Sequence, residues 1–225
     1  MKKEQIKFYT GVGSRETPKS ILKIMYRLAC KLEADGWTVR TGDADGADAA
    51  FRQVEKCQVF TANHAEARGI KLASKFHPAW NRCSPYARRL HGRNSYQVLG
   101  KSLNCPSSFI ICWTRDAATT HKQRSIETGG TGTAISIGDH YHIPVFNLAD
   151  PDHLNRMLAF LDGRTHKESN LYQITAPHFC AGIELRSPGR NHCAPILNYM
   201  QTWSLRTIQK YVLSKEWKIE PVTAK

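Results

Sequence analysis

The sequence predicts an α/β protein built on a parallel β-sheet with helices on both faces. Two strand–loop–helix units open the chain, with strands expected at residues 7–12 and 37–41. The run at 108–113 is the most apolar in the chain, as expected for a central strand that is covered on both faces. Alternating strands and helices joined by right-handed crossovers imply a Rossmann-like arrangement.

The remaining elements follow in order along the chain. Thr17 and Pro18 suit the start of the first helix, and Gly36 ends it. The second strand leads into a helix through residues 49–51, and residues 57–61 form a short third strand. Ser84-Pro85 begins a long helix that reaches about Ser102. We expect a further helix to start within 129–133, a last strand at 144–148 and a helix at 151–161.

A polar, turn-rich segment at 162–170 predicts a linker between two domains. The first is the Rossmann-like domain at 1–162, and the second is a small α+β module of unknown role at 171–225. The module is expected to hold short strands or a hairpin within 172–184 and 194–200, and an amphipathic helix at 203–215. It also contains His178, Cys180, His192 and Cys193, whose spacing fits no standard zinc finger, so a packed hairpin is favoured over a metal site.

Composition narrows the class of protein. The formal net charge is +13, which suggests an anionic partner such as a nucleotide, a nucleic acid or a phosphorylated signal; a merely basic surface is the alternative. The seven cysteines are scattered through apolar runs, as free thiols are in a reducing compartment. No run of about 18 apolar residues is present, and the charged start at 1–5 lacks a signal-peptide pattern. We therefore expect a cytoplasmic protein with no membrane partner.

The first strand ends in a glycine-containing loop, Gly11-Val12-Gly13-Ser14-Arg15, that precedes a helix. Glycines allow the backbone to approach an anion, and a helix N-terminus adds positive potential. Gly13, Ser14 and Arg15 are therefore candidate ligands of a phosphate. An ordinary tight turn is the alternative interpretation.

The second strand leads to an acidic loop, Gly42-Asp43-Ala44-Asp45-Gly46-Ala47-Asp48. Carboxylates here suit ribose hydroxyls, an exocyclic amine or proton transfer better than they suit a phosphate. Gly42, Asp43, Gly46 and Asp48 are candidate ligand-binding residues, and Asp48 is the favoured one. For Asp43 and Asp45, capping of the following helix is the default interpretation, and the loop does not match a calcium EF-hand.

The strongest local signal is Gly129-Gly130-Thr131-Gly132-Thr133, after the buried strand and at the start of a helix. Its glycines and hydroxyls can surround a phosphate, although it matches neither a Walker A loop nor a full dinucleotide fingerprint. Parallel strands end at one edge of a sheet, so this loop and the first loop are expected to share a crevice. Arg93 and Asn94 on the long helix, and Thr114 after the buried strand, complete the predicted ligand-binding set.

These motifs, in this order, resemble the SLOG superfamily over residues 6–160. That group includes DprA-like DNA-processing proteins, Lonely Guy cytokinin-activating hydrolases and sensors of nucleotide-derived ligands, and the chain is most similar to DprA-like proteins of phages. The resemblance implies a Rossmann-like fold, a homodimer, ligand binding at the loops named above and, for a phage protein, the host cytoplasm.

The chain departs from the Lonely Guy motif at two positions. Thr128 replaces its proline, and Ser136 stands where the family carries a glutamate that serves N-glycosidic hydrolysis. Glu127 and Asp48 are therefore the candidate catalytic carboxylates if the chain is an enzyme. No cofactor and no metal belong to the predicted site.

Three functions remain open from the sequence. The first is a nucleotide-binding hydrolase that cleaves an N-glycosidic or phosphate-ester bond. The second is a non-catalytic sensor or sequestering protein for a signal such as an ADP-ribose derivative, which in a phage would blunt host defence. The third is DprA-like binding of single-stranded DNA, for which Trp80, Tyr86 and Tyr96 are the available stacking aromatics.

Overall fold

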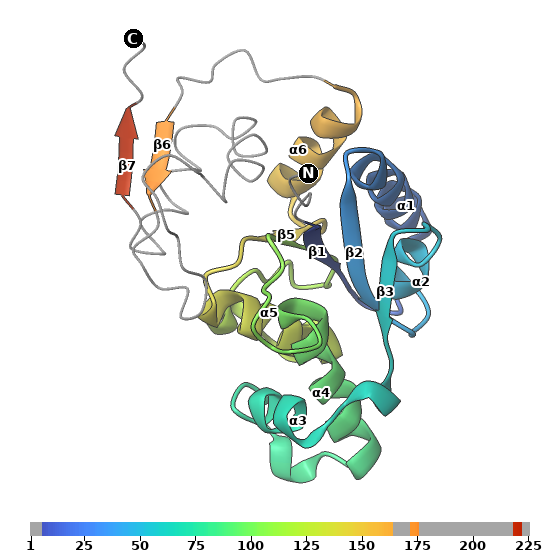
Figure 1. The fold of residues 1–225 in the computed structure, drawn as a ribbon, viewed down its shortest axis with the longest axis vertical. Coiled ribbons are helices and arrows are strands. Elements are labelled where there is room, and N and C mark those ends of the chain that lie inside the picture. Colours follow the sequence, from blue (N-terminus) through green and yellow to red (C-terminus); the bar gives the residue numbers. More distant parts are fainter. Residues whose placement is uncertain (1–5, 164–171, 176–217, 222–225) are drawn as a thin grey trace, which may run out of the picture. The chain divides into compact units, whose positions relative to one another are not determined.

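The computed structural model describes residues 6–163, 172–175 and 218–221. The chain divides into two compact units after Leu154. The first unit holds a five-stranded, all-parallel sheet in the order β3-β2-β1-β4-β5 (Figure 1). The predicted Rossmann-like α/β fold is confirmed. The predicted domain limits at 162 and 171 stay a prediction.

The five strands are short and lie close to the predicted positions. They are β1 (Lys7–Gly11), β2 (Trp37–Gly42), β3 (Cys57–Phe60), β4 (Ile110–Cys112) and β5 (Val145–Asn147). In register, Thr10 of β1 lies opposite Arg40 of β2 and Ile110 of β4. Every residue of β4 and β5 is buried, as expected for parallel strands covered on both faces.

Helices cover both faces of this sheet. α1 (Lys19–Ala34) and α2 (Ala47–Phe51) pack together on one face, and α4 (Pro85–Leu99) and α5 (Gly132–His140) pack together on the other (Figure 1). α1 buries its apolar stripe, as its helical spacing predicts. Its start lies one residue later than expected. Pro18 occupies the cap position, and the Thr17 hydroxyl instead donates to the Ser14 carbonyl oxygen at 2.7 Å.

The long helix α4 begins as predicted, because the Ser84 hydroxyl accepts from the Ala87 amide at 3.2 Å and Pro85 follows it. It ends at Leu99, before the predicted Ser102, where Gly100 adopts a φ of 72°. Every residue from Gly92 to Leu99 is buried. One cause is α3 (Ala67–Ser74), a helix that the sequence analysis did not predict and that packs along α4 (Figure 1).

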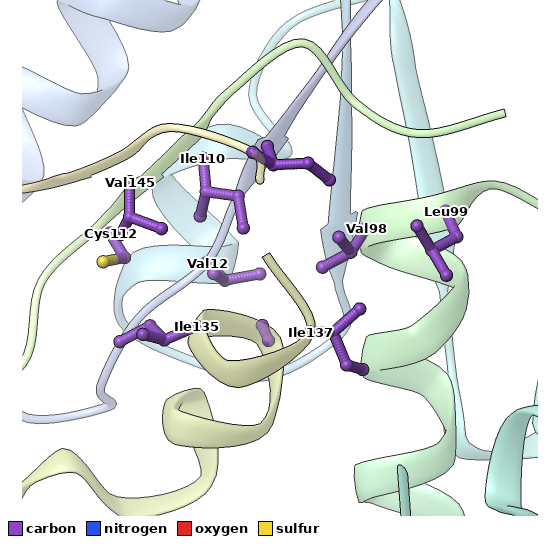
Figure 2. Packing of buried hydrophobic residues seen from close by; sticks show 10 residues of the cluster. Val12, Val98, Leu99, Ile110, Cys112, Ile135, Ile137 and Val145 are labelled. Atoms are coloured by element: carbon purple, nitrogen blue, oxygen red, sulfur yellow. The ribbon is translucent and has the colours of Figure 1, made fainter. Parts of the chain in front are cut away.

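An apolar cluster fills the space between the sheet and helices α4 and α5 (Figure 2). β4 contributes Ile110 and Cys112, α4 contributes Val98 and Leu99, and α5 contributes residues that include Ile137. Cys112 is fully buried, and all five described cysteines are free thiols. This packing fixes α4 and α5 against the strand ends where the predicted loops lie.

The last helix and two further strands lie toward the C-terminal end of the chain. α6 spans Pro151–Leu161, as predicted, and β6 (Tyr172–Thr175) pairs in antiparallel fashion with β7 (Lys218–Pro221). The other predictions for the tail, at His178, Cys180, His192 and Cys193 and at residues 194–200 and 203–215, lie outside the described residues. Within the described ranges, no helix combines the length and hydrophobicity needed to cross a membrane.

Candidate functional site

The order of the sheet reverses between β1 and β4, which are neighbours although β2 and β3 separate them in the chain. In open α/β sheets, the crevice at such a reversal is the usual place for a ligand. Backbone hydrogen bonds continue to connect the two chain segments at the ends of β1 and β4. The Val12 amide donates to the Ile111 carbonyl oxygen, and the Ser14 amide donates to the Trp113 carbonyl oxygen, both at 3.1 Å.

A cavity of about 370 Å³ is lined by residues of this region. Its walls are the loop after β1, the middle of α4 and the glycine-rich turn before α5. Most of the predicted site residues line it together: Gly13, Ser14, Arg15, Asp48, Arg93, Asn94, Glu127, Gly129, Gly130 and Thr131. Gly13 and Gly130, which come from the loops expected to meet, are therefore on one cavity.

The other predicted residues, Gly42, Asp43, Gly46, Thr114, Gly132 and Thr133, are not among the cavity-lining residues. Two of these positions, Gly42 and Gly46, need glycine because neighbouring atoms leave no room for a Cβ. A Cβ on Gly42 would collide with the side chains beneath the cavity, those of Asp48 and Gln97 included. Gly46 has a φ of 75°, and a Cβ there would lie 2.7 Å from the Ser14 carbonyl oxygen. Gly46 therefore allows the acidic loop to pack on the first loop.

Arg93 of α4 joins the acidic loop to the helix. Its guanidinium forms an ion pair with Asp43 and donates a hydrogen bond to Asp48 Oδ2, which lies 3.2 Å from Nη2. Arg93 Nε is buried and has no hydrogen-bond partner among the described residues. Burial and the nearby charge of Arg15 lower the pKa of Arg93 to about 10. Arg93 is thus a buried cation whose partners are on the acidic loop, with one donor left over.

Asp48 is the buried carboxylate of the site, at 3 % exposure. Burial raises its pKa to about 7, against hydrogen bonds from the backbone at Ala44 and Gly13 and the positive charges of Arg52 and Arg15. A carboxyl group with a pKa near neutrality can donate or accept a proton under physiological conditions. Asp48 therefore has the properties of a general acid or base.

Gln97, one turn beyond Arg93 and Asn94 on α4, also lines the cavity. It is 1 % exposed, and both its Nε2 and its Oε1 are buried without a hydrogen-bond partner among the described residues. A buried, unpaired amide is costly, by about 1–3 kcal/mol for each unsatisfied group, and such groups are rare in folded proteins. A ligand with a donor and an acceptor at this wall would satisfy Gln97. The sequence analysis did not select it.

The glycine-rich turn belongs to a short 3₁₀ helix, Ile126–Thr131, that leads directly into α5. Gly129 needs to be glycine because its φ is 57° and its ψ is −149°. Gly130 has no such requirement, and a Cβ there would have nothing within 4 Å. The surface over Gly130 is therefore open for a ligand to approach the backbone.

α4 holds this turn by two side-chain contacts. Asn94 Nδ2 donates to the Gly130 carbonyl oxygen at 3.0 Å, and His91 Nδ1 lies 2.9 Å from the Thr133 hydroxyl. Burial and the charges of His77 and Arg124 lower the pKa of His91 to about 4, so its imidazole is neutral. Asn94 and Thr133, which were predicted to contact a ligand, thus also position the loop.

Asp116 holds the same turn from the other side. It accepts hydrogen bonds from the hydroxyls of Thr128, Ser125 (2.7 Å) and Thr114 (2.8 Å) and from the Ser125 amide (3.1 Å). Partial burial acts to raise the pKa of Asp116, but these hydrogen bonds outweigh it and lower the pKa to about 2. Predicted residue Thr114 is therefore a buried link between the end of β4 and this carboxylate.

Charged side chains at the rim of the cavity differ in whether they are paired. Glu127, the other predicted catalytic residue, is half-exposed and lies 3.3 Å from Arg115 Nε, and Arg115 also pairs with Glu16 at 2.7 Å. Arg15 is exposed, lines the cavity and forms no ion pair with the described residues. Arg15 is thus the cation that is available to an anionic ligand.

The Ser14 amide of the first loop donates to the Trp113 carbonyl oxygen, so this amide is not free to bind a phosphate. Tyr96, one of the candidate stacking aromatics, is 2 % exposed and packs on Phe60, so no base can stack on it. Tyr86 remains exposed.

The neighbourhood of the cavity includes one positioning residue from α2's end. Arg52 Nη1 donates to the carbonyl oxygens of Gly42 (2.9 Å) and Ala44 (2.8 Å) and so holds the acidic loop in its turn. No local pattern marks Arg52, Gln97 or Asp116, because their partners lie elsewhere in the chain or carry no motif.

Neither protein-family models, nor curated proteins, nor solved structures give a match to this chain.

Proposed function

We propose that the protein binds a small nucleotide-derived ligand in the cavity between the first loop and the glycine-rich turn. The observation that carries this proposal is that Gly13, Gly130 and the unpaired amide of Gln97 line one cavity at the reversal of the sheet. Its volume, about 370 Å³, is at the small end of ligand pockets, which favours a mononucleotide-sized ligand over a dinucleotide.

The chemistry of the walls suggests an orientation for the ligand. Its phosphate would approach Gly130 and the start of α5, where the backbone is open, and Arg15 would supply a positive charge. Its ribose or base would lie toward Gln97, which offers both a donor and an acceptor, and toward Asp48.

Thermal-shift screening of the full chain followed by calorimetry tests this binding. The probes are nucleoside mono- and diphosphates, ADP-ribose, cyclic nucleotide signals and inorganic phosphate. A ligand present at 100 times its dissociation constant stabilises the folded chain by about 2.7 kcal/mol, so a true ligand produces a clear rise in Tm.

Gly130→Asp is the sharpest variant, because it adds a negative charge where nothing lies within 4 Å. We expect it to fold normally and to weaken binding of the best ligand by at least about tenfold. Gln53→Glu, at an exposed position shortly after α2, changes the net charge equally and should bind as the unaltered chain does. The proposal fails if no probe raises the Tm, or if Gly130→Asp binds as tightly as the unaltered chain.

A second candidate function, hydrolysis of the N-glycosidic bond of the ligand, is favoured by Asp48. Its buried carboxyl group has a pKa near neutrality and lines the cavity. In this reaction water attacks the anomeric carbon of the ribose, the C–N bond breaks, and the base leaves with a proton donated by Asp48. The proton lost by the attacking water restores that carboxyl group.

Incubation of the best ligand with the protein, followed by chromatography for free base and ribose phosphate, tests this step. Asp48→Asn should bind the ligand and release no base, whereas Glu127→Gln, altered at the exposed rim, should retain most of the activity. If the unaltered chain leaves its ligand intact, the hydrolase candidate fails, and a sensor or sequestering protein is the function that binding alone supports.

A further inference from the structure

Three metal-ligating side chains meet beside the cavity, and one of them, His91, also lines it. His77 and Cys83 lie between α3 and α4, and His91 lies on α4. Each is half-buried, and one ligating atom from each lies within 4.8 Å of the other two. The Cys83 Sγ is 3.6 Å from Nδ1 and 3.8 Å from Nε2 of His77, and the two imidazole rings are 4.3 Å apart between centroids.

The separation between His77 and Cys83 fits a tetrahedral zinc ion. With Zn–S at about 2.3 Å and Zn–N at about 2.0–2.1 Å, a tetrahedral site places sulfur and nitrogen about 3.6 Å apart. The separation between His77 Nδ1 and Cys83 Sγ is 3.6 Å. Two imidazoles and one thiolate are also the donors that zinc prefers over magnesium or calcium.

His91 has the second-nitrogen hydrogen bond that is usual for a metal-ligating histidine. Its Nδ1 lies 2.9 Å from the Thr133 hydroxyl, which leaves Nε2 for a metal ion when Nδ1 carries the proton. A hydrogen bond on the second ring nitrogen is the usual means by which proteins fix the ring and tautomer of a ligating histidine. We propose that His77, Cys83 and His91 bind a zinc-class divalent metal ion, with Thr133 positioning His91.

Two neighbouring groups, the Ala79 amide and the Arg124 guanidinium, affect metal binding at these side chains. The Ala79 amide contacts His77 Nδ1 at 3.2 Å, and coordination through Nδ1 would exchange this long hydrogen bond for a metal bond. Arg124 is the cation close to the two imidazoles, and it is held by the Phe76 carbonyl oxygen and the Ser136 hydroxyl. Release of the thiol proton of Cys83 on binding supplies a negative charge that offsets the added cation.

The site is joined to the cavity through His91, which lines the cavity as well. Three protein ligands leave the fourth tetrahedral position to a water molecule or another donor. The metal would also connect His77 and Cys83, which precede α4, to His91 on α4. His91 in turn contacts Thr133, which follows the glycine-rich turn. This proposal does not depend on nucleotide binding, because its test uses the metal alone.

Metal binding is measured on the full chain after removal of metals with a chelator. We expect one equivalent of Zn²⁺ to bind with a rise in Tm. Co²⁺ should give a thiolate-to-cobalt charge-transfer band and the strong visible bands of a four-coordinate site. Cys83→Ser should abolish the charge-transfer band, and His77→Ala should weaken zinc binding by at least about 100-fold. Thr133→Val should weaken it by about 10- to 100-fold, as loss of an outer hydrogen bond does.

Two control variants separate this site from other thiols. Cys105→Ser removes an exposed cysteine and should leave binding unchanged. The double variant Cys180→Ser/Cys193→Ser removes the thiols of the tail and should also leave it unchanged. The proposal is overturned if Zn²⁺ does not bind, if Cys83→Ser retains the charge-transfer band, or if the tail variant is the one that loses the metal.

Discussion

Asp48 is the buried carboxyl group among the residues that line the cavity. It is a carboxyl group at 3 % exposure, and it lies between a cation on α4 and the backbone of two loops. Because burial raises the pKa of this carboxyl group, the free energy of unfolding depends on whether the group is protonated. A change in the ionisation of this one group should be visible in the free energy of unfolding.

We expect the stability of the chain to fall as pH rises from about 4 to 7, with Asp48 as a cause. Unfolded, this group ionises near 3.8, whereas in the folded chain it keeps its proton up to about 7. The folded state therefore binds more protons across this window, and ionisation favours unfolding by about 1 kcal/mol per pH unit. Asp48→Asn does not titrate, so this decline should be absent from it.

Urea unfolding of both chains at pH 4.5, 6.0 and 7.5 checks this expectation. The free energy of unfolding of Asp48→Asn, relative to the unaltered chain, should increase with pH. A difference that stays constant over the three pH values would mean that Asp48 is ionised throughout the window.

Gln97 shows a different kind of residue-scale signal. Its amide nitrogen and oxygen are buried on a cavity wall without a hydrogen-bond partner among the described residues. This lack of partners is what marks Gln97 as a candidate ligand-binding residue. In the sequence it reads as one polar position on a long helix, and no motif includes it. It becomes a candidate only when burial and hydrogen bonding are known.

At the scale of elements, the glycine-rich turn depends on supports from two directions. α4 holds it through Asn94, and Asp116 holds it from the loop after β4. These contacts keep the turn in one conformation at the start of α5. A binding site on such a turn is preorganised, so loss of a support should reduce affinity for a ligand even where the cavity residues are unaltered.

Asp116→Asn is the variant that tests this support. It removes the charge that accepts four hydrogen bonds at Thr114, Ser125 and Thr128. We expect a loss of about 1–2 kcal/mol in the free energy of unfolding and at least about tenfold weaker ligand binding. Asp35→Asn loses only an exposed ion pair with Lys31 and should change neither by a measurable amount. Unchanged affinity in Asp116→Asn would show that the turn does not need this support.

The strands and most of the helices could be predicted because their signals are local. Alternating apolar residues, Pro85 at a helix start and glycines at strand ends are read within a few residues of one another. α3 was missed because its short amphipathic stretch, 67–74, gains its burial from α4, about 25 residues away. The same limit applies to the site. The glycine loops were predicted, whereas Asp116 and the cluster of His77, Cys83 and His91 exist only through contacts between segments.

At the scale of the whole molecule, the net charge of +13 exceeds what the cavity explains. Of the cavity-lining residues, Arg15 and Arg93 are cations, and Glu16, Asp48 and Glu127 carry carboxyl groups. Most of the excess positive charge therefore lies elsewhere. Binding of nucleic acid and assembly into a homodimer, both expected from the sequence, stay predictions.

Salt dependence separates the cavity from this general charge. A single strand that contacts six lysines or arginines should lose about 10²-fold in affinity between 50 and 200 mM salt. A mononucleotide in the cavity, with one or two phosphates, should lose less than about tenfold over the same range. Fluorescence titrations at both salt concentrations measure the two slopes. Equal slopes would mean that the nucleotide binds to the basic surface rather than in the cavity.

One turn of α4 reaches three separate segments: His91 touches Thr133, Arg93 pairs with Asp43 and Asp48, and Asn94 holds Gly130. These three residues, all within positions 91–94, connect the acidic loop to the glycine-rich turn and to the start of α5. A small rotation of α4 would shift the acidic wall and the glycine wall together. For the proposed nucleotide ligand, a variant of α4 that alters contacts at the acidic wall should therefore also alter contacts at the glycine-rich wall.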